Sequence, residues 1–194
     1  MKKLIAAFTG EEGVRFQQAD DPAESTGLYV YPDETRYEGE ISGGLFEGKG
    51  AVTWLDGSSF EGEWKNGLPD GKGRMLLPDG TTCEGEWKAG AIGESVVITS
   101  ADGSSYKGQW KNGRREGRGV FVFSDGKIYD GEWKDDLLHG KGVLTFTNGS
   151  KYEGEWREDT FYGKGVMTLT DGSRQEGEWK DGKFLLSVKK VKKT

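Results

Sequence analysis

The chain of 194 residues combines 33 glycines with only 33% hydrophobic residues, yet it carries seven Trp, seven Tyr and nine Phe. Scarce aliphatic residues argue against a compact aliphatic core, and the many aromatics argue against a disordered chain. A net charge of −6 argues against a nucleic-acid-binding protein, which needs a basic face. The single cysteine, Cys83, excludes an internal disulfide and fits a reducing compartment.

Residues 1–27 form an N-terminal segment. Its apolar start, Leu4 to Phe8, is too short for a secretory signal or a membrane span, so we expect a cytoplasmic protein. Two interpretations of residues 5–18 remain open. They form a degenerate repeat that caps the first sheet edge, or they form no repeat at all.

Residues 28–182 contain a repeat. The pattern Glu-Gly-Glu-Trp, or a close variant, recurs every 23 residues, starting at Glu38, Glu61, Glu84, Lys107, Asp130, Glu153 and Glu176. Asp-Gly or Asn-Gly pairs keep the same register at 56–57, 79–80, 102–103, 125–126, 148–149 and 171–172. Gly-(Lys/Arg)-Gly does so at Gly48, Gly71, Gly117, Gly140 and Gly163. Patterns locked in one register predict a tandem array of seven hairpins.

Each unit reads as two strands around the Asp-Gly turn. In the fifth unit we expect strands at 120–123 and 128–133, with residues 134–142 as the connection to the next hairpin. No helical periodicity is present. The predicted fold class is all-β: an elongated, single-layer, twisted antiparallel sheet of tandem 23-residue β-hairpins.

The apolar pattern also predicts the loop length. Phe121 and Phe123 should share a sheet face with Tyr129 and Trp133, because all are large and apolar. A two-residue loop would put the two pairs on opposite faces, since side chains alternate along a strand. A three-residue loop with Gly126 in the left-handed region puts them on the same face.

One sheet face is therefore expected to be aromatic and the other acidic. An aromatic strip of this length exceeds the apolar patches usual on monomers. Either ring stacking and curvature satisfy the face internally, or a partner segment lies along it. We favour a partner-binding groove formed by Trp54, Phe60, Trp64, Trp87, Tyr106, Trp110, Phe123, Tyr129, Trp133, Phe146, Tyr152, Trp156 and Trp179.

The candidate chemical groups favour no enzyme. Paired carboxylates recur in six of the seven units, so solvation of the polar face explains them better than acid–base catalysis. His139 is the only histidine and lacks a second metal ligand, and Cys83 lacks an activating histidine. Gly-Lys-Gly is not followed by the residues of a phosphate loop. We expect no catalytic residue, metal or cofactor.

The combined pattern resembles the MORN repeat (membrane occupation and recognition nexus). It reads Tyr-x-Gly-x-Trp-x-x-Gly, then His-Gly-x-Gly, then Asp-Gly, and residues 139–142 reproduce the His-Gly-x-Gly of the family. The resemblance covers residues 28–182. It implies a sheet of hairpins and a structural role for His139. Relatives include repeats attached to lipid kinases and lysine methyltransferases, junctional membrane proteins, and ciliary or cytoskeletal scaffolds.

The fourth repeat departs most from the pattern. Cys83 replaces an aromatic residue, Ser100 replaces a bulky apolar one, and Lys107 and Gln109 interrupt the acidic column. Neutral drift and a notch that fits a partner both remain open. Residues 183–194 are expected to form an edge strand at 184–188 and a basic tail with Lys189, Lys190, Lys192 and Lys193.

The predicted function is a non-catalytic protein–protein interaction scaffold that binds a partner helix or extended segment along the aromatic groove. The resemblance suggests a cytoskeletal, ciliary or flagellar (axonemal) assembly, with a homodimer as one form. The alternative is a membrane-surface adaptor for phospholipid. The only basic clusters that support this alternative are at the chain ends, and a face rich in Glu would repel anionic lipid.

Overall fold

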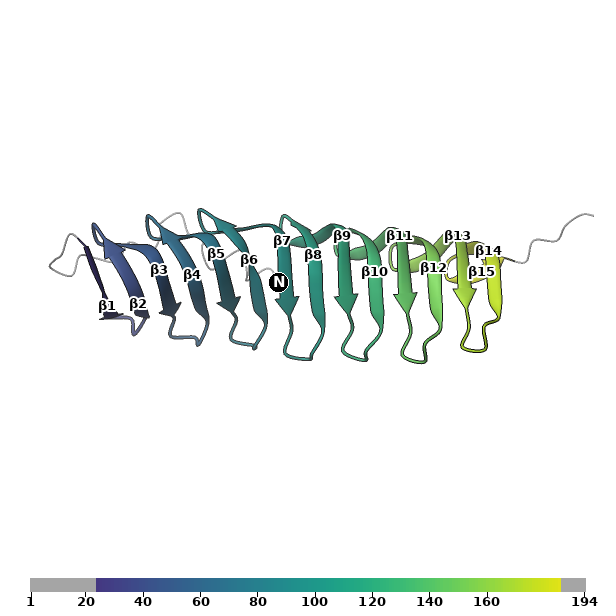
Figure 1. Ribbon diagram of the computed structural model, residues 1–194, viewed down its shortest axis with the longest axis horizontal. Helices are drawn as coiled ribbons and strands as arrows, with labels where there is room; N and C mark the ends of the chain where they lie inside the picture. Colours follow the sequence, from purple (N-terminus) through teal and green to yellow (C-terminus); the bar gives the residue numbers. More distant parts are fainter. Residues whose placement is uncertain (1–23, 186–194) are drawn as a thin grey trace, which may run out of the picture. The chain divides into compact units, whose positions relative to one another are not determined.

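The computed structural model describes residues 24–185, which form antiparallel β-strands without a helix (Figure 1). In the sheet, the strands follow one another in chain order from β1 to β15. Their bounds are β1 Glu24–Val30, β2 Arg36–Ser42, β3 Leu45–Thr53, β4 Ser59–Lys65, β5 Leu68–Leu76, β6 Thr82–Lys88, β7 Ala91–Thr99, β8 Ser105–Lys111, β9 Arg114–Val122, β10 Ile128–Lys134, β11 Leu137–Thr145, β12 Lys151–Arg157, β13 Thr160–Thr168, β14 Arg174–Lys180 and β15 Lys183–Leu185. The predicted fold class, an open antiparallel sheet of hairpin repeats, is confirmed.

Some predictions fall at or beyond the ends of the described region. β1 begins at Glu24, before the predicted start of the repeats at residue 28. β15 covers only the start of the predicted edge strand. The degenerate repeat proposed for residues 5–18 and the four lysines of the basic tail lie outside the described residues.

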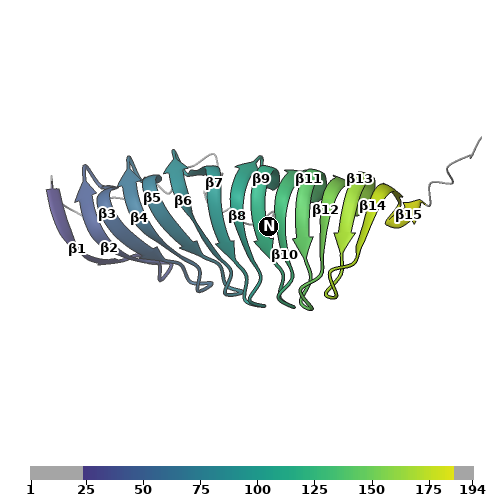
Figure 2. The same ribbon diagram turned by 45° about the vertical axis from the view of Figure 1, so that its right-hand side comes forward.

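The described residues divide into two compact units, which we treat separately. The first unit holds residues 24–103 and 110–113, and the second holds 104–109 and 114–185. Within each unit, successive strands lie side by side (Figure 2). Strands of nine and seven residues alternate through most of both units, which is the structural form of the 23-residue repeat.

The loop after each long strand has three residues. Between β9 and β10, the Phe123 N–H donates to the Lys127 carbonyl at 2.9 Å, and the Gly126 N–H donates to the Phe123 carbonyl at 2.9 Å. Gly126 has a φ of 88°, which side chains with a Cβ rarely adopt. The Asp125 carboxylate accepts the Lys127 N–H at 3.1 Å. The three-residue loop predicted from the apolar pattern is confirmed.

The expected connection at 134–142 is wrong. A two-residue turn, Asp135-Asp136, joins β10 directly to β11, and both residues have a positive φ, 50° and 71°. These angles are those of a type I′ hairpin turn. Residues 137–142 therefore belong to a strand rather than to a loop.

A bulge in β11 explains why this stretch looks like a loop in the sequence. Gly131 pairs with Gly142, but the next residue, Glu132, pairs with His139. Gly140 and Lys141 are thus extra residues, and Gly140 has a φ of 58°. Because such a bulge needs a glycine in the left-handed region, the Gly-Lys-Gly pattern marks a bulged strand.

Tyrosine rings packed over paired glycines form the core of the second unit. A Cβ on Gly142 would overlap the Tyr129 ring, which is 0% exposed. The Tyr129 hydroxyl donates to the Glu132 carbonyl at 2.9 Å. Trp133 stands at 90° to Tyr129 with the centroids 5.2 Å apart, and its indole N–H donates to the Gly119 carbonyl at 3.1 Å. The first unit repeats this packing around Tyr37 and Phe60.

The fourth repeat keeps a packed core because a small residue replaces the ring and a larger one replaces a paired glycine. Gly85 pairs with Val96, where the regular repeats pair two glycines. Gly73 holds the equivalent position in the preceding repeat, and a Cβ added there would overlap the Phe60 ring. The side chain of Val96 therefore leaves no room for a ring on the paired strand. Cys83, in the ring position, is 0% exposed and Val96 is 1% exposed. The small and large residues have changed places. That this repeat forms a notch for a partner stays a prediction.

This exchange predicts a compensating double mutant. Cys83→Tyr alone should destabilise the protein by about 1–3 kcal/mol, because the ring meets the Val96 side chain. Val96→Gly alone should also destabilise it by leaving a cavity. The double variant restores the regular packing, so its free energy of unfolding in urea should lie closer to wild type than either single variant. Additive losses would show that the two positions are not coupled.

Candidate interaction surfaces

Most residues of the predicted groove belong to the core. Three of the thirteen, Trp54, Phe123 and Phe146, are half-buried. The other ten are buried: Phe60, Trp64, Trp87, Tyr106, Trp110, Tyr129, Trp133, Tyr152, Trp156 and Trp179. Stacking over glycine and edge-to-face contacts between rings hide most of the aromatic surface. The partner groove stays a prediction, and the surface available for it is narrower than the sequence suggests.

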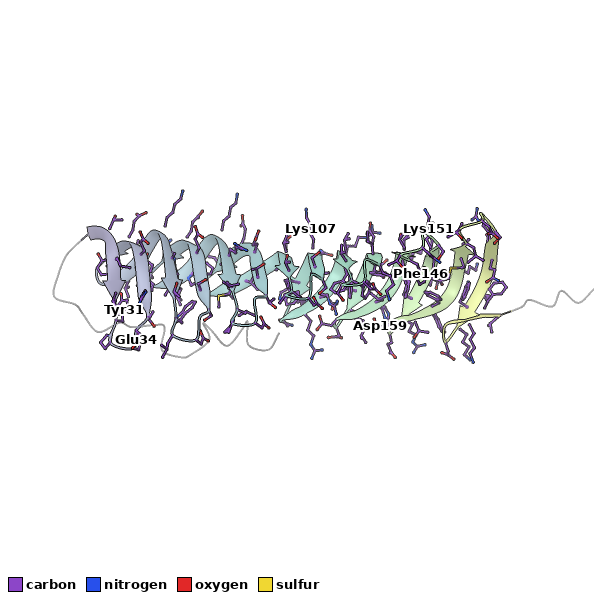
Figure 3. The ribbon with its side chains drawn as sticks, turned by 90° about the horizontal axis from the view of Figure 1, so that it is seen from below. Tyr31, Glu34, Lys107, Phe146, Lys151 and Asp159 are labelled. Carbon is purple, nitrogen blue, oxygen red and sulfur yellow. The ribbon has the colours of Figure 1, made fainter. Side chains whose placement is uncertain are left out.

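One accessible part of the aromatic face is a row at the edge that carries the three-residue loops. We call this the loop-edge row, and in the second unit it consists of Phe123, Phe146 and Leu169 (Phe146 is labelled in Figure 3). Leu169 is 43% exposed. The Phe123 ring packs edge-on against Phe121 at 4.7 Å, and Lys127 Nζ lies 5.3 Å from its centroid. In the first unit Tyr31, Trp54 and Leu77 hold the same position, and Ser100 interrupts the series.

One carboxylate of the pair has a structural role in several repeats. On the face opposite the aromatics, Glu132 Oε1 accepts the Lys141 N–H at the bulge, at 3.2 Å. Glu40 and Glu155 cap Lys49 and Lys164 in the same way, at 3.0 and 3.3 Å. A Cβ on the bulge glycine Gly140 would overlap the Glu132 carboxylate, so the glycine and the acid depend on each other.

Gln109 fits this role as well. Its Oε1 accepts the Arg118 N–H at 2.6 Å. A backbone N–H needs only an acceptor oxygen, so an amide serves as well as a carboxylate. The Glu-to-Gln change noted in the irregular repeat therefore keeps the interaction that matters for the fold.

His139 and Cys83 both lie on strands, β11 and β6. His139 is half-buried, and its backbone carbonyl accepts a hydrogen bond from the Tyr129 hydroxyl at 3.3 Å. Burial raises the pKa of the Cys83 thiol to about 12, so the thiol stays protonated at physiological pH. Within residues 24–185, no cluster of three or more His, Cys, Asp or Glu residues is arranged to hold a metal ion.

Arg115 was not identified from the sequence. It stands where the following repeats place Leu138 and Phe161, and its side chain is only 17% exposed. Its guanidinium lies 4.2 Å from the Trp133 ring centroid and forms an ion pair with Asp136 at 3.1 Å. Comparing residues 23 positions apart could have revealed it, because a charged residue in this apolar column is unusual.

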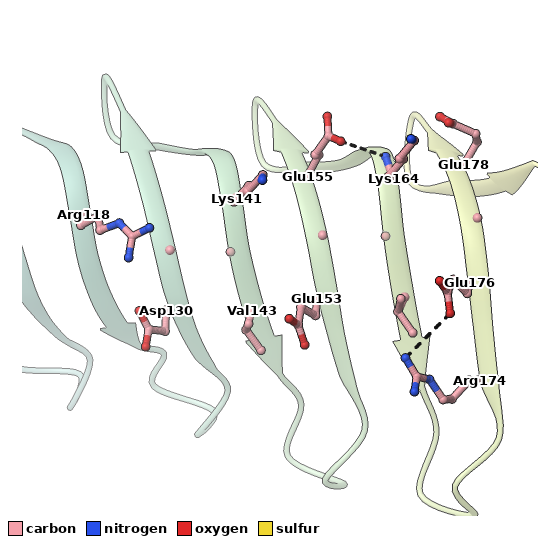
Figure 4. A pocket seen from close by; sticks show the side chains of 16 residues that line it. Arg118, Asp130, Lys141, Val143, Glu153, Glu155, Lys164, Arg174, Glu176 and Glu178 are labelled. Atoms are coloured by element: carbon pink, nitrogen blue, oxygen red, sulfur yellow. Dashed lines mark hydrogen bonds and ion pairs between the residues drawn. The ribbon is translucent and has the colours of Figure 1, made fainter.

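The polar face contains hollows. In the second unit a hollow of about 750 Å³ spans β9 to β14, with bare glycine backbone between two rows of side chains (Figure 4). One row consists of Arg118, Lys141, Glu155, Lys164 and Glu178, and the other of Asp130, Val143, Glu153, Val166 and Glu176. A smaller hollow of about 440 Å³ lies on the polar face of the first unit, around Ala51.

The capping role of the acidic column predicts how substitutions there behave. Glu132→Ala should cost about 1 kcal/mol of unfolding free energy, because the Lys141 N–H loses its acceptor. Glu132→Gln should cost much less, as the native Gln109 indicates. Asp130→Ala, which removes a carboxylate with no such bond, serves as the control in urea unfolding. Equal losses for the Ala and Gln variants would contradict the capping role.

Comparison with solved structures gives remote likenesses. The chain is similar to the TCP10 domain of Danio rerio CPAP, solved with a peptide of Danio rerio STIL, at 18% identity and a TM-score of 0.45, covering 77% of this chain and 67% of that chain. It is similar to the TCP domain of Drosophila melanogaster SAS-4 (dCPAP), solved with a proline-rich motif of Ana2 (dSTIL), at 13% identity and a TM-score of 0.49, covering 84% of this chain and 97% of that one. Likenesses at this level transfer neither a partner nor an activity.

A family model gives the firmer result. The MORN repeat model matches residues 37–59, 60–82, 106–128, 129–151, 152–174 and 176–184, more than half of the chain. The unmatched stretch between 82 and 106 coincides with the irregular fourth repeat. No curated protein sequence matches the chain significantly. Nowhere in residues 24–185 does a helix reach the length and hydrophobicity that crossing a bilayer demands. The chain belongs to the MORN repeat family.

Proposed function

We propose that the protein is a non-catalytic scaffold that binds a helical or extended segment of a partner protein along the loop-edge row. The observation that carries this proposal is the row itself. Phe123, Phe146 and Leu169 are partly exposed at regular intervals along a packed sheet. Large apolar side chains, aromatic ones above all, supply most of the binding energy in protein interfaces.

Rigidity supports the proposal. The backbone of Phe123 is held at both its N–H and its carbonyl by the loop hydrogen bonds, and its ring packs against Phe121. An anchor held in place before binding loses little conformational entropy when a partner arrives. The buried ladder behind the row supplies this rigidity, so the core aromatics contribute to binding without touching the partner.

Spacing defines the partner further. The row has one anchor for every two strands, which corresponds to intervals of about 9.6 Å. A partner segment with apolar residues at similar intervals would engage the three anchors of the second unit together. Once the first anchor is bound, the other two are close to the same partner segment, so each further contact increases the affinity.

The setting of this scaffold is a separate proposal. A cytoplasmic location, a cytoskeletal or ciliary assembly and a homodimer rest on the family resemblance alone. The lipid alternative gains no support from the described polar face, where cations and carboxylates alternate instead of forming a basic surface. The terminal lysines that would favour it lie outside the described residues. Lipid binding is therefore examined as one possible result of the experiment described below.

The test begins with affinity purification from the native source and identification of the bound protein by mass spectrometry. Phe123→Ala with Phe146→Ala should then weaken binding of the identified partner at least about tenfold, because two anchors are lost. The matched control is Val122→Ala with Ile128→Ala, which removes apolar side chains from the opposite face of the same hairpin.

Circular dichroism should show an intact β-sheet in both double variants, because neither touches the buried ladder. Unchanged binding of the Phe variant would place the interface elsewhere. Saturable binding to vesicles of anionic lipid, surviving high salt and removal of residues 189–194, would contradict a scaffold that binds only proteins.

A further inference from the structure

The hollow on the polar face of the second unit contains a second ordered row. We call it the acid–valine row: Asp130, Val143, Glu153, Val166 and Glu176, in that order across β10 to β14 (Figure 4; all but Val166 are labelled). Val143 pairs with both Asp130 and Glu153, and Val166 pairs with both Glu153 and Glu176. Carboxylates and valines therefore alternate strand by strand on one face.

The carboxylates of this row are available to an outside cation. Among the described residues, Asp130 and Glu153 form no ion pair or hydrogen bond through their side chains. Glu176 lies 3.9 Å from Arg174, with both side chains more than half exposed. Such an exposed pair contributes little and is readily exchanged.

The neighbouring row of the hollow is already balanced. Lys141 lies opposite Glu155, and Lys164 lies opposite Glu178, so opposite charges face each other across the strands. Glu155 also caps the Lys164 N–H at 3.3 Å. Arg118 lies opposite Glu132, so the hollow has one row whose cations each face a carboxylate across the strands. Its other row presents three carboxylates with apolar side chains between them.

The spacing of the carboxylates selects a conformation for the ligand. They stand two strands apart, at intervals of about 9.6 Å. A polyproline II segment returns to the same face every three residues, about 9.3 Å along its axis. In an α-helix the repeat closest to the carboxylate spacing is seven residues, about 10.5 Å. In an extended β-segment the residue three positions further along points to the opposite face.

We propose that the acid–valine row binds a partner segment in the polyproline II conformation that carries Lys or Arg at every third residue. Each cation meets one carboxylate, and the apolar residues between cations contact Val143 and Val166. Bare backbone at Gly142, Gly154 and Gly165 gives the segment room to approach the sheet. The site lies on the face opposite the loop-edge row, so it goes beyond the scaffold proposed above.

The first unit supplies an internal contrast. In the valine position of the corresponding row it places Arg74, which forms an ion pair with Glu84 at 3.2 Å. That arginine occupies the position of the apolar contact and neutralises a carboxylate. The first unit therefore lacks three consecutive carboxylates separated by apolar residues, and the same ligand should bind it poorly.

The test uses two fluorescent peptides of identical composition, measured by anisotropy against the full chain. One contains four Lys-Pro-Pro triplets, and the other has its four lysines in a block before its eight prolines. Net charge alone predicts equal affinity, or tighter binding of the block. The proposal predicts that the spaced peptide binds about tenfold tighter, because only its cations match the carboxylates. Equal affinities, or no saturable binding of the spaced peptide, would overturn it.

Variants locate the site. Asp130→Asn with Glu153→Gln should weaken binding of the spaced peptide about tenfold. Glu38→Gln with Glu61→Gln removes the same charge from the same columns of the first unit and should change affinity less than about twofold. Equal losses of affinity in the two double variants would show that the peptide responds only to net charge, which would contradict the proposed site. Phe123→Ala with Phe146→Ala should leave the peptide affinity unchanged, so the two proposed surfaces can fail independently.

Discussion

The structure depends on one interaction: an aromatic ring lying flat over two glycines that face each other across neighbouring strands. Tyr129 over Gly131 and Gly142 is the regular case. The ring gains a flat apolar surface, and its hydroxyl reaches the Glu132 carbonyl. Trp133 and Trp156 then close on it edge-on, at 5.2 Å each. A sheet can in this way bury its large residues without a second layer, which most domains require.

Because of this packing, the two faces of the sheet present different surfaces. The aromatic face is largely closed, and the loop-edge row proposed for a partner is backed by a packed core. The polar face keeps its hollows because glycine backbone lies between the rows of charged side chains. There, Glu132 and Glu155 of one column cap bulges, whereas Asp130 and Glu153 of the other column do not. The two proposed surfaces of the second unit therefore lie on opposite faces of the sheet.

The sequence predicted the repeat, its register, the faces and the three-residue loop, because each follows from spacing alone. It did not reveal the turn at Asp135-Asp136, since aspartate in the left-handed region depends on contacts that spacing does not encode. Asp136 Oδ1, for example, accepts the Arg115 N–H at 2.9 Å from the preceding repeat. The exchange between Cys83 and Val96 was likewise hidden, because the two departures matter only as a pair across strands. The exposed area of the thirteen groove residues was overestimated, because exposure depends on ring orientation, which composition does not give.

The most direct test of this account is the coupling between Gly142 and Tyr129, measured as free energies of unfolding. The three atoms nearest to a Cβ on Gly142 all belong to the Tyr129 side chain. The account predicts that Gly142→Ala destabilises the wild type by several kcal/mol and costs far less once Tyr129→Ala has removed the ring, a coupling of about 1–3 kcal/mol. An equal cost of Gly142→Ala in both backgrounds would contradict it, because the glycine would then serve the backbone rather than the ring.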